Sequence, residues 1–171
     1  TETNRLVIPW MNEFGIKIYY QLRSLEKDLD CKYLFPSTFT RPIFPLNINR
    51  VHEYIYVHEG FFNACFCPNS IVAGSLIISD YQKSLLKVYV DQGFKIVYWF
   101  DNYWIDQSAK NMVLKYLEND RTSLFFSWPK ESFSKDVNDA VIHNDQAILK
   151  ILENPPIISG LQLLVRLKFQ R

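Results

Sequence analysis

The sequence predicts an α/β fold in which a mostly parallel four-stranded sheet is flanked by helices and preceded by a small β-rich subdomain. Two observations predict it. From residue 53 onward, short apolar runs typical of buried strands alternate with segments of helical spacing, which indicates parallel strands joined by right-handed crossovers. Before residue 50, the chain instead holds short β-like runs interrupted by prolines. With 171 residues, the chain is long enough for one well-buried core.

The N-terminal part is predicted to contain two strands, Arg5–Trp10 and Ile16–Tyr20, separated by a turn at residues 12–15. A stretch punctuated by prolines at positions 36, 42 and 45 follows. Because proline cannot donate a hydrogen bond to a neighbouring strand, this stretch is predicted to be loop and edge strand.

The rest of the chain is predicted to alternate between strands and helices. The N-cap of one helix is expected at Ser79 and its end at Gly93. The strands are expected at Tyr54–His58, Ser70–Ala73, Lys95–Phe100 and Ser123–Trp128. The helices are expected at Phe61–Cys67, Ser79–Gln92, Ile105–Asn119, Asp136–His143, Asp145–Glu153 and, after two consecutive prolines, Ile157–Phe169.

These patterns divide the chain into a small β-rich subdomain over residues 1–50, an α/β domain over 51–154 and a C-terminal helix over 155–171. An aromatic content of 16% with few glycines argues against disorder. With 19 basic and 18 acidic residues, any polyanionic partner has to be bound by a local patch. No apolar stretch reaches the roughly 20 residues of a membrane span, so no membrane partner is expected.

Acidic residues follow three of the four predicted strands. Glu59 comes directly after the first strand, Asp101 after the third, and Asp136 and Asp139 after the fourth. Residues just past the carboxyl ends of parallel strands meet in one crevice. Carboxylates gathered there repel one another unless a hard cation such as Mg²⁺ lies among them. The arrangement therefore indicates phosphoryl-transfer chemistry on nucleotides or nucleic acid.

Each acidic residue also has a local explanation. Glu59 fits an exposed turn. Asp101 fits a loop that leads into a helix with Asp106 near its first turn. Asp136 and Asp139 fit the N-cap and third positions of one helix, where the helix dipole favours negative charge. Their recurrence at the same topological position is what favours the functional interpretation.

Short motifs recur in an order that covers nearly the whole chain. They are Arg5–Pro9, Gln21–Arg23, Lys32–Tyr33, Tyr56–Gly60, Asn69–Gly74, Phe100–Asn102, Ser127–Trp128 and Lys135–Asp139. Together they resemble the Toprim domain shared by bacterial-type primases, topoisomerases and some nucleases, and the resemblance is closer to primases of T-even-like tailed phages. It implies a Toprim fold with a preceding primase subdomain, and synthesis of RNA primers on single-stranded DNA.

The resemblance also implies roles for the acidic residues. Glu59 would act near the reacting phosphates as a metal ligand or general base. Asp101 would bind Mg²⁺ or Mn²⁺, and Asp136 with Asp139 would complete the acidic pocket. Bridging metal ions assist both deprotonation of the attacking 3′-hydroxyl and neutralisation of the leaving pyrophosphate.

Three basic residues are candidates for contact with the substrates: Arg23, Lys32 and Arg41. They fall at positions where similar proteins carry basic residues that face the nucleoside triphosphate or the template. Arginine and lysine complement phosphate oxygens, although a solvated loop would also contain them. The implied partners are single-stranded DNA, ribonucleoside triphosphates and a replicative helicase, in the cytoplasm of an infected bacterial cell. Since the chain has no Cys-x-x-Cys pair, the zinc-binding domain of complete primases is expected upstream or on another protein.

The sequence departs from the Toprim pattern at two expected carboxylates. Tyr103 stands two positions after the first aspartate, and Asn63 stands in the segment after Glu59. A phenol is a poor Mg²⁺ ligand compared with a carboxylate. Asp106 is a candidate auxiliary acid. These departures leave three hypotheses: an active primase, a Toprim nuclease, and a degenerate Toprim subunit that binds nucleic acid or protein without catalysis.

Overall fold

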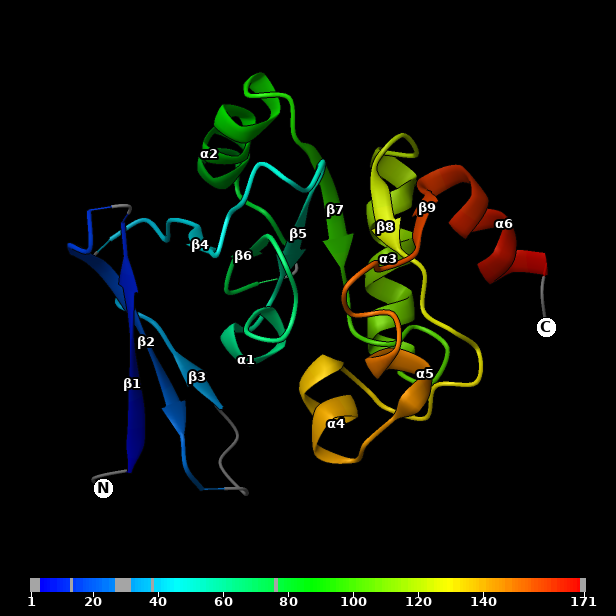
Figure 1. Cartoon of the computed structure of the whole chain (residues 1–171), viewed down its shortest axis with the longest axis horizontal. Coiled ribbons are helices and arrows are strands. Elements are labelled where there is room, and N and C mark those ends of the chain that lie inside the picture. Colours follow the sequence, from blue (N-terminus) through cyan, green and yellow to red (C-terminus); the bar gives the residue numbers. More distant parts are fainter. Residues whose placement is uncertain (1–3, 13, 27–31, 38, 76, 170–171) are drawn as a thin grey trace.

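Two β-sheets organise this chain in a computed structural model that describes residues 4–12, 14–26, 32–37, 39–75 and 77–169. The smaller sheet is antiparallel and has the strand order β1-β2-β3, and the larger sheet has the order β4-β6-β5-β7-β8-β9 (Figure 1). No helix within the described residues is long and apolar enough to cross a membrane.

The smaller sheet contains the two predicted N-terminal strands, β1 (Arg5–Met11) and β2 (Lys17–Ser24), with a short third strand, β3 (Tyr33–Leu34). The predicted turn between β1 and β2 is held by Asn12, whose side-chain oxygen accepts the N–H groups of Phe14 and Ile16. The sheet buries alternate residues, as a half-exposed sheet should.

The predicted parallel strands form the centre of the larger sheet. They are β6 (Ser70–Val72), β5 (Tyr54–His58), β7 (Lys95–Trp99) and β8 (Leu124–Phe126), and all neighbouring pairs among them are parallel. Two antiparallel edge strands extend the sheet to six: β4 (Phe44–Leu46) beside β6 and β9 (Ile157–Ser159) beside β8. The expected loop and edge strand around Pro45 is confirmed by β4.

The prediction of one helix over residues 157–169 is wrong for its first residues. These form β9, and only Gly160–Phe169 is helical, as α6. Backbone pairing with β8 outweighs the helical spacing of the apolar residues here. The division of the chain at residues 50 and 154 stays a prediction.

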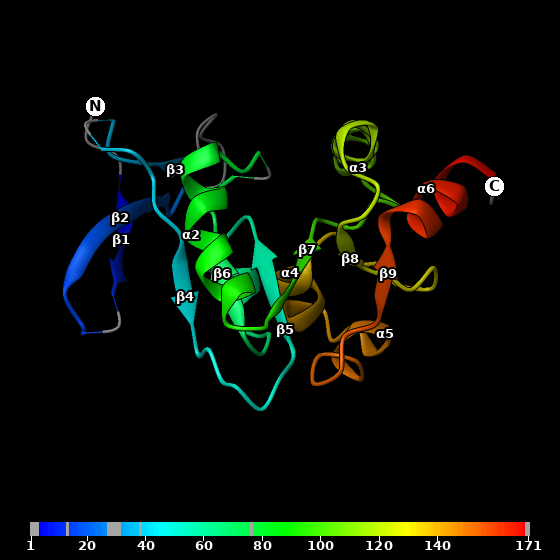
Figure 2. The same ribbon diagram turned by 90° about the horizontal axis from the view of Figure 1, so that it is seen from above.

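Helices cover both faces of the larger sheet. Helices α3 (Gln107–Asn119) and α6 lie on one side and contact each other, whereas α4 (Val137–Ile142) and α5 (Gln146–Leu149) lie on the other (Figure 2). Helix α1 (Phe61–Ala64) packs against α4 and is shorter than predicted, and so is α5. Helix α2 (Asp80–Asp91) begins with the expected Ser79 cap and ends before Gly93, whose φ is +94°.

The junction between β9 and α6 supplies a test of the packing. A Cβ atom on Gly160 would lie 2.8 Å from the carbonyl oxygen of Arg121 and 2.8 Å from a methyl carbon of Leu117. We expect Gly160→Ala to lower the free energy of unfolding by about 1–3 kcal/mol, because the backbone cannot move aside cheaply. Urea unfolding followed by circular dichroism measures this change.

Gly60→Ala is the matched control. Its Cβ would meet only the Tyr33 hydroxyl, at 3.7 Å, and Gly60 already has extended backbone with φ −107°. We expect this variant to stay within about 0.5 kcal/mol of the parent. If both variants unfold at the same urea concentration, the close packing at the β9–α6 junction is wrong.

Candidate active site

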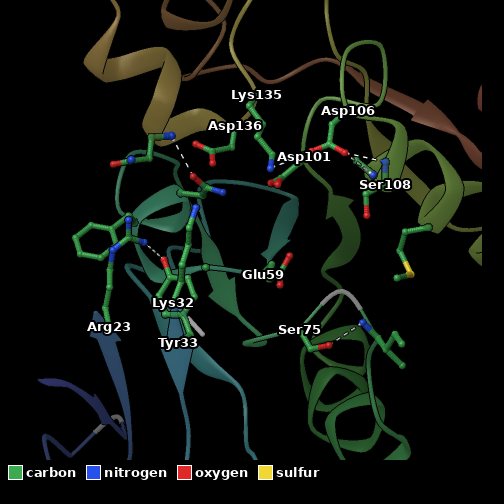
Figure 3. Close-up of a pocket in the computed structure, with 17 residues that line it drawn as sticks. Arg23, Lys32, Tyr33, Glu59, Ser75, Asp101, Asp106, Ser108, Lys135 and Asp136 are labelled. Carbon is green, nitrogen blue, oxygen red and sulfur yellow. Dashed lines mark hydrogen bonds and ion pairs between the residues drawn. The ribbon is translucent and has the colours of Figure 1, made fainter. Parts of the chain in front are cut away.

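The carboxyl ends of the parallel strands open into a cleft of about 520 Å³ (Figure 3). Glu59 follows β5 directly, and Asp101 follows β7 after one residue. The loop after β8 brings Lys135 and Asp136 to the start of α4. Of the residues expected to be functional, the structure brings six to the cleft lining: Arg23, Lys32, Glu59, Asp101, Asp106 and Asp136.

Asn102 holds the two strand-end loops together. It is fully buried, its backbone N–H donates to the Lys135 carbonyl at 2.7 Å, and its side-chain amide donates to the Ser134 carbonyl at 3.0 Å. These bonds fix Asp101, the preceding residue, beside the segment that contains Asp136. Sequence reasoning named Asn102 only as part of a motif, because a bond between loops 32 residues apart leaves no local pattern.

A second buried residue, Asp145, fixes the loop from behind. One of its carboxylate oxygens accepts hydrogen bonds from the Ser132 hydroxyl and from the N–H groups of Phe133 and Ser134. Burial alone would raise the pKa of Asp145, but these hydrogen bonds hold it below its ordinary value. Asp145 therefore stays ionised and supports the loop that presents Lys135.

The acidic side of the cleft contains several carboxylates close to one another. Burial, together with the nearby Asp136 and Glu59 carboxylates, raises the pKa of Asp101 to about 7, and Lys135 opposes this rise. Glu59 is exposed toward the open cleft, yet loss of surrounding water raises its pKa, against the opposing charges of Lys135 and Arg41. The strand ends therefore form an electrostatically strained acidic cluster.

The opposite side of the cleft is basic and aromatic. The Arg23 guanidinium lies 5.0 Å from the Tyr33 ring centre and 4.8 Å from that of Phe62, and it donates a hydrogen bond to the Tyr33 hydroxyl. Lys32 is exposed beside it (Figure 3). Contacts with these two rings restrict the direction in which the guanidinium points while leaving its charge in the cleft.

Two expected site residues lie outside the cleft lining. Asp139 uses one carboxylate oxygen to accept the Lys135 N–H at 2.9 Å and the other to contact the His143 ring nitrogen at 2.9 Å. Arg41 stacks over Phe35 at 3.7 Å and donates to the Gly74 carbonyl at 2.6 Å. Both therefore support neighbouring loops, and Arg41 also acts on Glu59 through its charge.

The two residues that replace expected carboxylates have different surroundings. Tyr103 is only 2% exposed and points inward, where its hydroxyl accepts the Trp128 N–H at 3.0 Å and contacts the Phe126 carbonyl at 3.2 Å. Asn63 lines the cleft, and its side-chain oxygen accepts the Asn138 N–H at 3.0 Å. Tyr103 is thus part of the core, whereas Asn63 links α1 to α4.

The acidic cluster suits a cation that is shared with a substrate. Within the described ranges, no group of three or more His, Cys, Asp or Glu residues is arranged to hold a metal ion by itself. Mg²⁺, however, usually keeps several waters and is bound by one or two carboxylates together with substrate phosphates. Glu59, Asp101 and Asp136 offer such oxygens. Burial, followed by the charges of Asp136 and Glu59, raises the pKa of Asp101, and a cation would relieve the part that comes from these charges.

Asp101 should make stability depend on pH. Its pKa is raised in the folded chain, so the folded state binds more protons than the unfolded state between about pH 4 and pH 7. Without metal, stability should therefore fall as the pH rises through this window. We expect Asp101→Asn to be more stable than the parent by only about 1–2 kcal/mol at pH 8, because solvent in the cleft screens part of the charge on Asp101. The variant should lose this advantage near pH 4. Thermal melts in EDTA from pH 4 to pH 8 measure this difference, and parallel curves for the two proteins would contradict it.

Tyr103 should behave as a core residue. Tyr103→Phe leaves the Trp128 N–H without its acceptor, and we expect it to cost about 1–2 kcal/mol of unfolding free energy. Tyr103→Asp would restore the carboxylate that the Toprim pattern contains, but it buries an unpaired charge, so we expect a loss of more than about 3 kcal/mol. Denaturant unfolding with and without Mn²⁺ measures both; an aspartate variant that is stable and binds Mn²⁺ more tightly would refute the inward position.

Solved structures with a similar fold are catalytic parts of primases. A DNA primase domain from Pseudomonas aeruginosa aligns with a TM-score of 0.66 and 18% identity over 95% of this chain and 54% of that chain. The RNA polymerase domain of the Mycobacterium tuberculosis primase DnaG, in complex with double-stranded DNA, aligns with a TM-score of 0.70 and 17% identity over 95% and 56%. A DnaG primase catalytic domain bound to single-stranded DNA gives 0.64 and 17% over 97% and 56%.

No protein-family model matches the sequence, and no curated protein matches it. The chain spans slightly more than half of the length of the primase structures described above. At this level of identity the likeness shows the fold, which is the mixed α/β fold of DnaG-type primase catalytic cores: a mostly parallel sheet flanked by helices and preceded by a β-rich part. The resemblance to Toprim primases is thereby confirmed at the level of the fold, whereas the closer resemblance to T-even-like phage primases stays a prediction.

Proposed function

We propose that this chain is the catalytic core, or part of the core, of a primase that makes short RNA primers on single-stranded DNA by metal-dependent nucleotidyl transfer. The observation that carries the proposal is the two-sided cleft. Its acidic side, with Glu59, Asp101 and Asp136, faces a basic side with Arg23 and Lys32. A nucleotidyl transferase has to hold polyanionic substrates and stabilise a reacting phosphate in the same place, and this cleft provides groups for both.

In the proposed reaction, the 3′-oxygen of the growing primer attacks the α-phosphorus of a ribonucleoside triphosphate, and the bond to pyrophosphate breaks. Mg²⁺ or Mn²⁺ held by Asp101 and Asp136 would supply charge neutralisation at the phosphates. Glu59 is suited to accept the proton of the attacking hydroxyl, because its raised pKa brings it closer to neutral pH. Asp139 stays among the acidic residues of the proposed site. Its carboxylate accepts the backbone N–H of Lys135 and so helps to position that residue.

Arg23 and Lys32 would hold the triphosphate or the template backbone. The Arg23 guanidinium is restricted by its contacts with Tyr33 and Phe62, which reduces the entropy lost when it binds a phosphate. Arg41 would contribute through its charge near Glu59. The phage setting, with a replicative helicase partner and the cytoplasm of an infected bacterium, belongs to the proposal as the expected context.

The main alternative is a degenerate Toprim subunit that binds nucleic acid or protein without catalysis. The inward position of Tyr103 favours it, since that side chain offers no oxygen to the cleft. A Toprim nuclease would use the same acidic residues but would hydrolyse phosphodiesters. The DNA-bound primase structures with a similar fold support a DNA template partner.

Primer synthesis tests the proposal. We expect the parent chain, with single-stranded DNA, ribonucleoside triphosphates and Mn²⁺ or Mg²⁺, to produce short RNA. Glu59→Gln and Asp101→Asn should each lower the rate by at least about a hundredfold, because they remove the proton acceptor and a metal ligand. Labelled primers resolved on denaturing gels measure the product.

Lys87→Gln is the control, since it removes an exposed 2.6 Å ion pair with Asp91 on α2, outside the cleft lining. It should synthesise primers like the parent. Intact synthesis in Glu59→Gln would refute the site. Fragments of DNA formed with metal but without ribonucleotides would indicate a nuclease, and absence of both activities would favour the degenerate subunit.

A further inference from the structure

Lys135 places a positive charge inside the acidic cluster. Its side chain reaches between Asp136 and Asp106 with its end next to Asp101, and its ammonium nitrogen lies 3.0 Å from an Asp106 carboxylate oxygen (Figure 3). The same charge opposes the rise in the pKa of both Glu59 and Asp101. A single ammonium group therefore acts on every carboxylate at this side of the cleft.

The position of this ammonium group is fixed from both ends of the side chain. On the backbone, the Lys135 N–H donates to Asp139 and its carbonyl accepts the Asn102 N–H. At the other end, Asp106 is itself held in place as the N-cap of α3. One Asp106 oxygen accepts the N–H groups of Ser108 and Ala109, which leaves the other oxygen for Lys135.

This arrangement changes the role expected of Asp106. As an auxiliary acid it would bind a metal ion, but both of its oxygens already have partners. The other basic residues in the cleft lining, Arg23 and Lys32, belong to the opposite side (Figure 3). The repulsion among Glu59, Asp101 and Asp136 is thus offset locally by Lys135 before any ion binds.

We propose that Lys135 is a built-in counter-cation that takes the place of a second metal ion, so that the cleft binds one divalent cation at a time. The carboxylate oxygens next to the ammonium group are already neutralised in part, and a second divalent ion there would meet its charge directly. The remaining oxygens of the cluster bind the single ion. This inference rests on the proposed function only for the identity of that ion.

The proposal predicts that loss of Lys135 changes the affinity for metal in an unusual direction. Loss of a residue from a metal site normally weakens metal binding. Replacing Lys135 with a neutral residue should instead strengthen it, because a competing positive charge disappears while all carboxylates stay. The same replacement should lower the stability of the metal-free protein, because the carboxylates then repel one another without a neighbouring positive charge.

Titration calorimetry of the whole chain with Mn²⁺ tests the first effect. We expect Lys135→Gln to bind Mn²⁺ roughly fivefold more tightly than the parent, or to take up a second ion where the parent binds one. Lys87→Gln, which loses an exposed lysine–aspartate pair elsewhere, should match the parent. Unchanged or weaker binding by Lys135→Gln, at unchanged stoichiometry, would overturn the proposal.

A double-mutant cycle in EDTA tests the second effect without metal. We expect Lys135→Gln to lower the midpoint of thermal unfolding in the parent and to lower it less in an Asp101→Asn background, where one repelling carboxylate is gone. Equal losses in both backgrounds would refute the counter-cation role. If the parent binds no Mn²⁺, the metal assignment of the proposed function fails, and this cycle alone decides the role of Lys135.

Discussion

The cleft depends on hydrogen bonds that force like charges together. Asn102 ties the loop after β7 to the loop after β8, and Asp145 ties the second loop to α5. Buried bonds of this kind are costly to break, because each lost partner leaves an unsatisfied polar group. Their combined strength keeps Asp101 beside Asp136, although burial and the neighbouring carboxylates both raise the pKa of Asp101. The acidic cluster is therefore maintained by the buried hydrogen bonds of Asn102 and Asp145 behind it as well as by the Lys135 ammonium group within it.

The basic side of the cleft is positioned by aromatic packing. Trp10 is fully buried and stacks on Phe44 at 5.7 Å, and the cluster around them joins β1 and β2 to β4 and β6. Aromatic burial contributes large stabilisation and fixed geometry. Because β2 contains Arg23 and β4 is hydrogen bonded to β6, this packing sets the distance across the cleft. The basic side of the cleft thus rests on an aromatic cluster separate from the core around β7 and β8.

The sequence predicted what local patterns determine. Apolar runs such as Lys95–Phe100 indicated the parallel strands, and the strand-end rule then placed Glu59, Asp101 and Asp136 in one cleft. The edge strand at Ile157–Ser159 was missed because its apolar spacing continues into α6 and only pairing with β8 makes it extended. The role of Lys135 was missed for a related reason: its partner Asp106 lies 29 residues away, and nothing local marks the pair.

Tyr103 and Lys135 alter the charge of the cleft in the same direction. An inward tyrosine contributes no negative charge to the cleft, and a lysine among the carboxylates adds a positive one. A site with less net negative charge needs fewer bound cations to become neutral. A metal ion leaves whenever its free concentration falls, whereas a lysine fixed by Asp106, Asp139 and Asn102 does not. Part of the positive charge that neutralises this cleft is therefore covalently attached to the chain. In the proposed reaction, this would leave a bound Mg²⁺ or Mn²⁺ ion to interact with the phosphates of the substrate.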